Sequence, residues 1–243
     1  MELNYRTERE DLAAAFQWTA RLNMHEAVAN HFSIIVEGGK RFLVNPNQRH
    51  FSQIKSSDIL DLDINEKEPF KLNNAPDPTA WGLHSALHKH VPHAKCVMHA
   101  HPIYSTVLAT LSDSYLKPID QNTAAFFNRM IVDEDFGGLA FENEGLRCAK
   151  YFNNPRVKIM IMGNHGLLVL GDSVADAFNR MYYFERAAET YIKALQTNIP
   201  LKVLPDDIAE KTGQEMDNYP GQAESHFNEI KNILLKEGSD FNK

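Results

Sequence analysis

The sequence contains few cysteines and no long apolar run, and each of these absences excludes a class of protein. Only Cys96 and Cys148 occur among 243 residues, which is too few for a disulfide framework and suits a reducing compartment. No apolar run approaches the roughly 18–20 residues that a membrane span needs. The first ten residues, MELNYRTERE, are charged and lack the apolar segment of a secretion signal. We therefore expect a cytoplasmic protein without a membrane partner.

Basic clusters are also missing. The formal net charge is −7, and no stretch is dense in lysine and arginine. Proteins that bind nucleic acid usually present such a stretch to the phosphate backbone, so we expect no nucleic-acid partner. The remaining composition, 43% hydrophobic and 23% charged, is that of a globular protein able to bury a sizeable core.

Apolar spacing predicts helices and strands that follow one another without strict alternation. Helical spacing and capping residues mark the segments 8–22, 78–91, 103–111, 122–130, 143–152 and 173–195. Strand-like runs mark 31–46, with a hairpin turn at Gly38 and Gly39, and also 56–64, 95–100 and 158–171, with a turn at 163–166. This mixture indicates the α/β class, with a mixed or antiparallel sheet covered by helices.

Beyond Pro200 the sequence changes character. The stretches IPLKVLPDD and DNYPGQ are typical of linkers, and 224–238 has the spacing of a short amphipathic helix. We therefore divide the chain into a domain over 1–198 and a C-terminal tail over 199–243. The tail is expected to pack on the domain or on a neighbouring subunit.

The segment CVMHAHP places two histidines at strand spacing. Side chains two residues apart on a strand point the same way, about 6.5–7 Å apart at the backbone, so His99 and His101 can reach one ion. A catalytic zinc site usually has three protein ligands and one open position. His165, between glycines at a predicted strand turn, is the candidate for the third ligand. Taken alone, the His99 and His101 pair is equally compatible with a structural or solvent-facing role.

Other residues with reactive side chains have simpler interpretations. His84 and His88 lie four apart on one predicted helix face, and we interpret them as exposed helical histidines rather than as a second metal site. Cys96 lies in a predicted strand and is interpreted as a core residue. No serine or cysteine lies in a nucleophile elbow and no phosphate-loop pattern is present, so neither nucleophilic catalysis nor nucleotide binding is indicated.

Five segments together resemble one family. The stretches ANHFSI, FLVNP, SSDIL, LHSALHKHVPHAKCVMHAHP and NHGLLVLGDSVADAFNRMYYFERA occur in the order and spacing of the class II aldolase/adducin family, over about residues 8–198. They are most similar to its bacterial, adducin-like members of unassigned activity. The resemblance implies a three-layer α/β/α fold around a mixed, largely antiparallel sheet. It also implies a homotetramer with a metal site near a subunit boundary.

The same resemblance implies a metal-dependent lyase. Family histidines that match His99, His101 and His165 bind a divalent ion, most often zinc, with manganese and iron as alternatives. Such an ion polarises a carbonyl or hydroxyl of a small-molecule substrate and stabilises an enediolate as a carbon–carbon bond breaks. Asn30 matches an asparagine of the family's phosphate pocket, and Gln121 matches its proton-donating tyrosine more loosely. Both are therefore expected to bind substrate.

Departures from the family pattern change which substrate and which acid/base residue we expect. The sugar-phosphate aldolases carry an acid/base glutamate where this chain has Ala80, and a methyl group cannot move a proton. Their phosphate pocket uses glycines and serines where this chain has Ala29, Asn47-Gln48 and Pro78-Thr79, so a phosphorylated substrate is not expected. The catalytic residue that replaces the glutamate stays open, and the candidates are Glu185, Asp120 and His31.

Three functions are compatible with these patterns. The first, which we favour, is a metal-dependent lyase, of aldolase or decarboxylase type, acting on a small unphosphorylated carbonyl compound. The second is a non-catalytic, adducin-like interaction protein, since adducin heads also lack the glutamate. The third is a non-haem iron oxygenase, although the usual iron ligand set includes a carboxylate. Metal analysis separates the second function from the other two.

Overall fold

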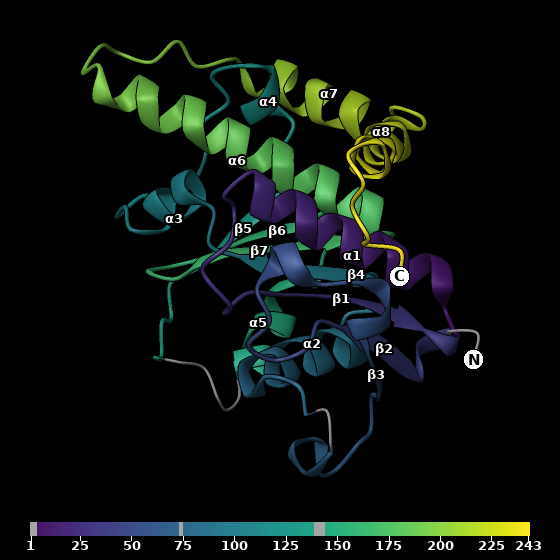
Figure 1. Ribbon diagram of the computed structural model, residues 1–243. Coiled ribbons are helices and arrows are strands. Elements are labelled where there is room, and N and C mark those ends of the chain that lie inside the picture. The colour runs from purple at the N-terminus through teal and green to yellow at the C-terminus, as the bar shows by residue number, and fades with distance from the viewer. Residues whose placement is uncertain (1–3, 73–74, 139–143) are drawn as a thin grey trace.

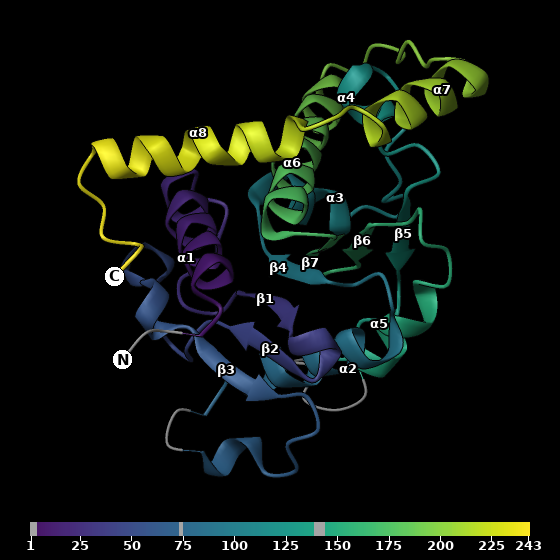
Figure 2. The ribbon, with the colours of Figure 1, turned by 90° about the vertical axis from the view of Figure 1, so that its right-hand side faces the viewer.

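The computed structural model describes residues 4–72, 75–138 and 144–243, which form three layers (Figure 1). A seven-stranded sheet is the middle layer, and helices cover both of its faces (Figure 2). The predicted α/β/α architecture is confirmed. None of the helices in these described ranges combines the length and the apolar composition that crossing a bilayer requires.

The strand order in the sheet is β3-β2-β1-β4-β7-β6-β5. All neighbouring strands pair antiparallel except β5 and β6, which are parallel, so the sheet is mixed and largely antiparallel as expected. The strands are β1 His31–Val36, β2 Arg41–Val44, β3 Leu60–Asp63, β4 Cys96–Ala100, β5 Met130–Asp133, β6 Ile159–Met162 and β7 Gly166–Gly171.

The helices lie between and after the strands. The α-helices are α1 Arg6–Arg21, α2 Pro78–His90, α3 Ile103–Ala109, α4 Gln121–Ala124, α5 Glu144–Tyr151, α6 Val174–Gln196, α7 Asp206–Asp217 and α8 Gln222–Lys236. Short 3₁₀ turns are η1 Glu37–Gly39, η2 Phe51–Gln53, η3 Ser56–Asp58 and η4 Pro69–Lys71. Of the helix predicted over 143–152, residue 143 lies outside the described residues, and α5 begins at Glu144.

The two helical layers cover opposite faces of the sheet, and this decides which strand residues meet which helices. Met98 of β4 lies in the core shared with α1, α6 and α8, whereas Val97 lies in the cluster shared with α2 and α5. Because side chains alternate along a strand, His99 faces the same side as Val97. The histidines of β4 and β1 therefore face the layer that contains α2. Cys96 is fully buried in the larger core, as predicted.

The helix predicted over 122–130 is wrong beyond its first turn. Helix α4 ends at Ala124, and Asn128 has a left-handed φ of 55°, which interrupts helical geometry. Met130–Asp133 then forms the edge strand β5, with Met130 opposite Ile159 of β6. The apolar and β-branched residues of this segment suit a strand, and the neighbour that pairs with them is remote in sequence.

The C-terminal residues pack on the rest of the chain. Phe227, Ile230 and Leu234 of α8 are buried in the core that also contains α1 and α6. The chain end lies beside η3, where Ser56 N–H donates to the carbonyl of Phe241 (2.8 Å). Helix α7, for which the sequence analysis predicted no element, precedes α8 and packs near α4. Apolar contacts with α1 and α6 thus hold α8 against this chain.

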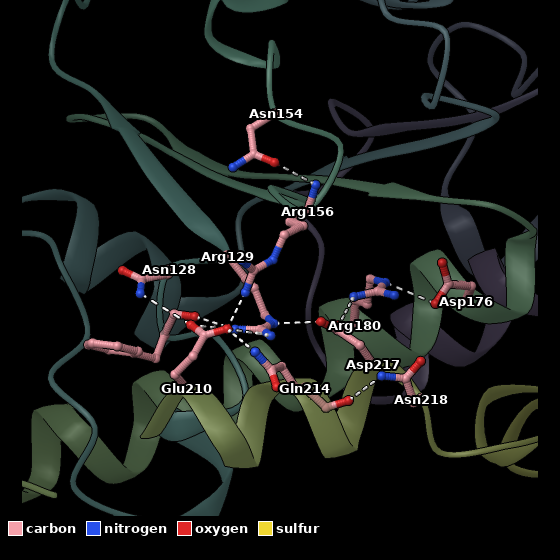
Figure 3. Close-up of polar contacts among 11 residues, drawn as sticks. Asn128, Arg129, Asn154, Arg156, Asp176, Arg180, Glu210, Gln214, Asp217 and Asn218 are labelled. Carbon is pink, nitrogen blue, oxygen red and sulfur yellow. Dashed lines mark hydrogen bonds and ion pairs between the residues drawn. The ribbon is translucent and has the colours of Figure 1, made fainter. Parts of the chain in front are cut away.

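A buried arginine, Arg129, fixes α7. Figure 3 shows its guanidinium between Glu210 and Asp217 of α7. Arg129 Nε–H donates to Asp217 (2.6 Å), and Nη1–H donates to the carbonyl of Phe127 (2.7 Å). The Arg129 side chain is only 2% exposed, so its charge depends on these partners. Arg156 forms a further ion pair with Glu210 (Figure 3).

Candidate metal centre

Three histidines from two segments meet at one edge of the sheet. His99 lies in β4, His101 directly follows that strand, and His165 lies in the turn that leads into β7. Strands β4 and β7 pair antiparallel with Ala100 opposite Leu167, so the end of β4 and the start of β7 are adjacent. One potential ligand atom from each of the three rings lies within 4.8 Å of the other two.

The two histidines of the β4 segment offer Nε2 atoms. His99 Nε2 and His101 Nε2 are 3.1 Å apart. Two nitrogens on one tetrahedral zinc ion are about 3.3 Å apart when each Zn–N bond is about 2.0–2.1 Å. The other ring nitrogen of His99, Nδ1, donates to the carbonyl of Leu167 (3.1 Å), which leaves the lone pair on Nε2. This backbone contact orients the ring as the outer contacts of metal-binding histidines do.

His165 supplies the third nitrogen. Its Nδ1 is buried and has no hydrogen-bond partner among the described residues, and Glu144 Oε1 is 3.9 Å away. An unpaired buried polar atom is costly unless a ligand satisfies it. Burial lowers the pKa of His165 to about 4, so the ring is neutral near pH 7, as a metal ligand must be. The three residues therefore fit a divalent cation.

Gly166 keeps this edge of the sheet open for His101. A Cβ atom at Gly166 would lie 2.5 Å from His101 Cδ2 and 2.9 Å from the carbonyl oxygen of Ala100. Any larger residue would push the His101 ring away from its neighbours. The glycine after His165 is thus required by close packing.

Glu144 is a site residue that the sequence analysis missed. Its carboxylate lies near His165 and also near Arg147, at 3.5 Å. Burial raises the pKa of Glu144 to about 7, against the opposing effect of Arg147. Nothing in the local sequence marks this residue, because it reaches the centre only through the packing of α5 on α2.

A buried histidine array lies beside the cluster of His99, His101 and His165. The prediction that His84 and His88 are exposed is wrong. The array consists of His31, Ser33, His84 and His88, of which none is more than 7% exposed. His31 and Ser33 are two residues apart on β1 and therefore point to the same face of the sheet. His84 and His88 are about one turn apart on α2. Amphipathic spacing identifies a helix face, but only the packing of α2 under β1 shows that this face is buried.

The array contacts the cluster of His99, His101 and His165 through His31. His31 lies opposite His99 in the β1–β4 pairing, and the two ring centroids are 5.0 Å apart. Burial lowers the pKa of His31 to about 3 and the pKa of His88 to about 4, so both rings are neutral near pH 7. Burial also lowers the pKa of His84 well below its ordinary value.

The two residues predicted to bind substrate lie in different places. Asn30 is buried beside the centre, where its Oδ1 accepts from the backbone N–H of Glu26 (2.6 Å) and of His101 (3.4 Å). Its Nδ2 is buried without a partner among the described residues. Gln121 is exposed at the start of α4 and lines a pocket with Thr212, Tyr219 and other residues of the C-terminal segment. That pocket contains none of the three histidines, so the chain does not bring Gln121 to them.

The residues considered as replacements for the family's acid/base glutamate also lie in different parts of the structure. Ala80 is buried among apolar residues of β2 and β3. Glu185 accepts from the backbone N–H groups of Tyr104 and Ser105 (2.9 Å each) and so caps the start of α3. Asp120 forms a capping box with Thr123 at the start of α4. Of the three candidates named from the sequence, His31 lies beside His99.

Comparison with known proteins finds relatives over most of the chain. The family model described as "Class II Aldolase and Adducin N-terminal domain" matches residues 10–192. A Pseudomonas aeruginosa protein, provisionally named as an aldolase class 2 protein, is 28% identical over 204 residues, which are 82% of this chain and 76% of that protein. The adducin-related protein of Schizosaccharomyces pombe is 28% identical over 210 residues, and the match covers 82% of this chain and 60% of that protein.

A solved structure shares the whole architecture. The aldolase II superfamily protein from Pseudomonas syringae superposes with a TM-score of 0.87 at 26% identity, covering 100% of this chain and 98% of that one. Coverage of this order includes the segment after residue 199. The similarity in fold therefore extends past the residues that the family model matches.

Proposed function

The chain belongs to the family of class II aldolases and adducin N-terminal domains, and from this premise we propose that it is a metal-dependent lyase. The proposed substrate is a small carbonyl compound without a phosphate group, cleaved by retro-aldol reaction or by decarboxylation. The observation that carries the proposal is the convergence of three neutral histidine nitrogens within 4.8 Å of one another.

The proposed metal ligands are His99, His101 and His165, and zinc is the proposed ion. A divalent ion held there would supply Lewis-acid stabilisation of an enolate or enediolate. Three neutral imidazoles leave the charge of such an ion uncompensated, which favours an anionic ligand beside it. Leu167 orients the His99 ring through its carbonyl group, and Gly166 leaves space for the ring of His101.

We propose that Asn30 binds substrate. We also propose that a residue other than Ala80 transfers protons to and from the substrate. The unpaired Nδ2 group of Asn30 supports a role as a hydrogen-bond donor to a substrate oxygen. His31 and Glu144 are placed beside the metal ligands, and either position suits a group that exchanges a proton with substrate. Gln121 could serve this centre only from another subunit, since its pocket in the same chain excludes the three histidines.

Family membership supports a homo-oligomer, and we propose a tetramer as its form. Cys96 and Cys148 are free and buried, which supports a reducing compartment such as the cytoplasm. The adducin-related relative favours a second candidate function, a scaffold without catalysis. In that case the histidine cluster would contribute to stability alone.

Metal analysis combined with a substrate screen tests the proposal. We expect about one zinc, manganese or iron ion per chain. The His99→Ala variant should lose the ion because one of three ligands is removed. His90→Ala, at an exposed position on α2, is the matched control and should retain it.

The screen offers 2-keto and hydroxy acids to the metal-loaded protein and measures release of pyruvate, aldehyde or carbon dioxide. Turnover by the wild type that is lost in His99→Ala supports the lyase. A folded wild-type protein that binds no metal, or that binds metal and turns over none of these acids while a partner protein co-purifies, favours the scaffold.

A further inference from the structure

The donor and the acceptor of each hydrogen bond in the buried histidine array can be assigned, starting from His88, the member most remote from His99 along the array. His88 Nδ1 lies 2.8 Å from the carbonyl oxygen of Ala94. A carbonyl oxygen only accepts, so Nδ1 of His88 carries the hydrogen and donates it. Because the ring is neutral, Nε2 of His88 then carries a lone pair. Ser33 Oγ, at 2.8 Å, must donate its single hydrogen to that lone pair.

The assignment continues through Ser33 to His31. With its own hydrogen donated to His88, the Ser33 oxygen accepts from Nδ1–H of His84. His84 therefore has a lone pair on Nε2, which lies 2.7 Å from Nδ1 of His31. His31 consequently donates through Nδ1–H. The lone pair of this neutral ring is left on Nε2.

The hydroxyl group of Thr79 is also close enough to donate to the Nε2 lone pair of His31, but it donates to Asp77 instead. The Thr79 hydroxyl is 3.3 Å from His31 Nε2 but 2.5 Å from Oδ1 of Asp77. A hydroxyl has one hydrogen, and a carboxylate is the stronger acceptor. The Nε2 atom of His31 therefore keeps its lone pair, on a ring that lies across from His99.

We propose that Ser33, His84 and His88 are positioning residues that hold His31 in the Nδ1–H tautomer, so that His31 Nε2 is a fixed hydrogen-bond acceptor beside the metal centre. The acceptor selects ligands that present a hydroxyl group there and disfavours ligands that present an anionic oxygen, since two lone-pair-bearing atoms repel. The selection between hydroxyl and anionic ligands rests on the proposed function, whereas the Nδ1–H tautomer of His31 does not. The substrate class that follows is an unphosphorylated hydroxy-carbonyl or hydroxy-acid compound.

The tautomer can be observed directly in metal-free protein. Histidine-selective ¹⁵N labelling and long-range ¹H–¹⁵N correlation spectra distinguish a protonated ring nitrogen from one with a lone pair. The expected result for the wild type is Nδ1–H at His31, His84 and His88. In Ser33→Ala, His84 loses its acceptor and can instead donate through Nε2 to His31, so we expect Nε2–H to appear at His31.

Ser52→Ala is the matched control. Ser52 Oγ lies 2.8 Å from Nδ1 of the exposed His50, so this change removes a serine–histidine hydrogen bond outside the array. His31 should be unchanged in this variant. A wild-type His31 that carries its hydrogen on Nε2 would overturn the proposal even if Ser33→Ala did not fold. So would a His31 tautomer unaffected by Ser33→Ala in a folded protein.

Ligand selection is tested with two small probes on zinc-loaded protein. Glycolate presents a hydroxyl group where oxalate presents a second carboxylate. The ratio of the oxalate Kd to the glycolate Kd should fall about fivefold in Ser33→Ala, which is the effect of one hydrogen bond, and should be unchanged in Ser52→Ala. An unchanged ratio in Ser33→Ala, despite an altered tautomer, would overturn the selection. If the wild type binds no zinc, manganese or iron but shows the Nδ1–H tautomer, the positioning role stands and the lyase is rejected.

Discussion

Single buried histidines make the stability of this protein depend on pH. His88 is buried and contacts Ser33, the ring of Phe42 and the carbonyl of Ala94, and burial lowers its pKa to about 4. In the unfolded chain the same ring has its ordinary pKa near 6.5. Between these two values the unfolded state binds a proton that the folded state does not, so stability is lost as pH falls through this window.

At this scale we predict that His88→Gln removes part of the acid sensitivity. Lowering the pH from about 7.5 to about 5 should cost the wild type about 2 kcal/mol more unfolding free energy than it costs the variant, because the glutamine cannot be protonated. Urea unfolding of metal-free protein at the two pH values measures the difference. His90→Gln, at an exposed position of the same helix, should leave the wild-type pH dependence intact. Equal losses in the wild type and in His88→Gln would contradict the assignment of a neutral buried ring.

At the scale of elements, α7 is held by polar contacts rather than by a wide apolar face. Ala209 and Gly213 are the buried residues of α7, and Gly213 lies directly on the guanidinium of Arg129. A Cβ atom at Gly213 would be 2.5 Å from Nη1 and 2.6 Å from Cζ of Arg129. Arg129 cannot retreat, because Asp217 and the carbonyl of Phe127 hold it (Figure 3).

We predict that Gly213→Ala destabilises the protein by about 1–3 kcal/mol, because the methyl group overpacks this contact. In a freely exposed helix the same change would stabilise by up to about 1 kcal/mol, so even the sign is informative. Thermal and urea unfolding measure the effect. Gly137→Ala, where an added Cβ meets no atom within 4 Å, should be close to neutral. A Gly213→Ala protein at least as stable as the wild type would show that α7 does not rest on Arg129.

At the scale of the whole molecule, some exposed apolar residues lie near the cluster of His99, His101 and His165. Ile103 and Val107 lie one turn apart on α3 and are 61% and 38% exposed. Phe136 is half exposed, with its ring centroid 6.0 Å from that of His165. Exposed apolar residues one turn apart on a helix, such as Ile103 and Val107, are typical of protein–protein contacts. They fit the proposed oligomer, in which the site lies near a subunit boundary.

We predict that the double change Ile103→Lys and Val107→Lys converts the oligomer into smaller species, because burying two charges in the contact is costly. Sedimentation velocity measures the assembly state. Phe70→Lys, in η4 after the outer strand β3, is a control of similar exposure and should not change it. A wild-type protein that sediments as a monomer would remove the oligomer proposal, and an intact oligomer in the double variant would exclude α3 as its contact.

The sequence by itself determined those features that depend on near neighbours along the chain. The two-residue spacing of His99 and His101 at the end of a predicted strand pointed them the same way, and Asp77 with Pro78 located the start of α2. A predicted strand turn between glycines added His165 as the third candidate ligand. The family motifs added the three-layer architecture, which the sheet and its helices confirm. Local periodicity is sufficient for such features because the side-chain directions of a helix or strand are set within a few residues.

The tertiary structure alone decided which remote faces meet. Periodicity shows that His84 and His88 share a helix face, but only the packing of α2 against β1 places that face on Ser33 and makes it buried. Glu144 reaches His165 in the same way, through the packing of α5. Burial and hydrogen-bond direction, which set the protonation of these groups, are properties of contacts between distant segments, and a local pattern carries no record of them.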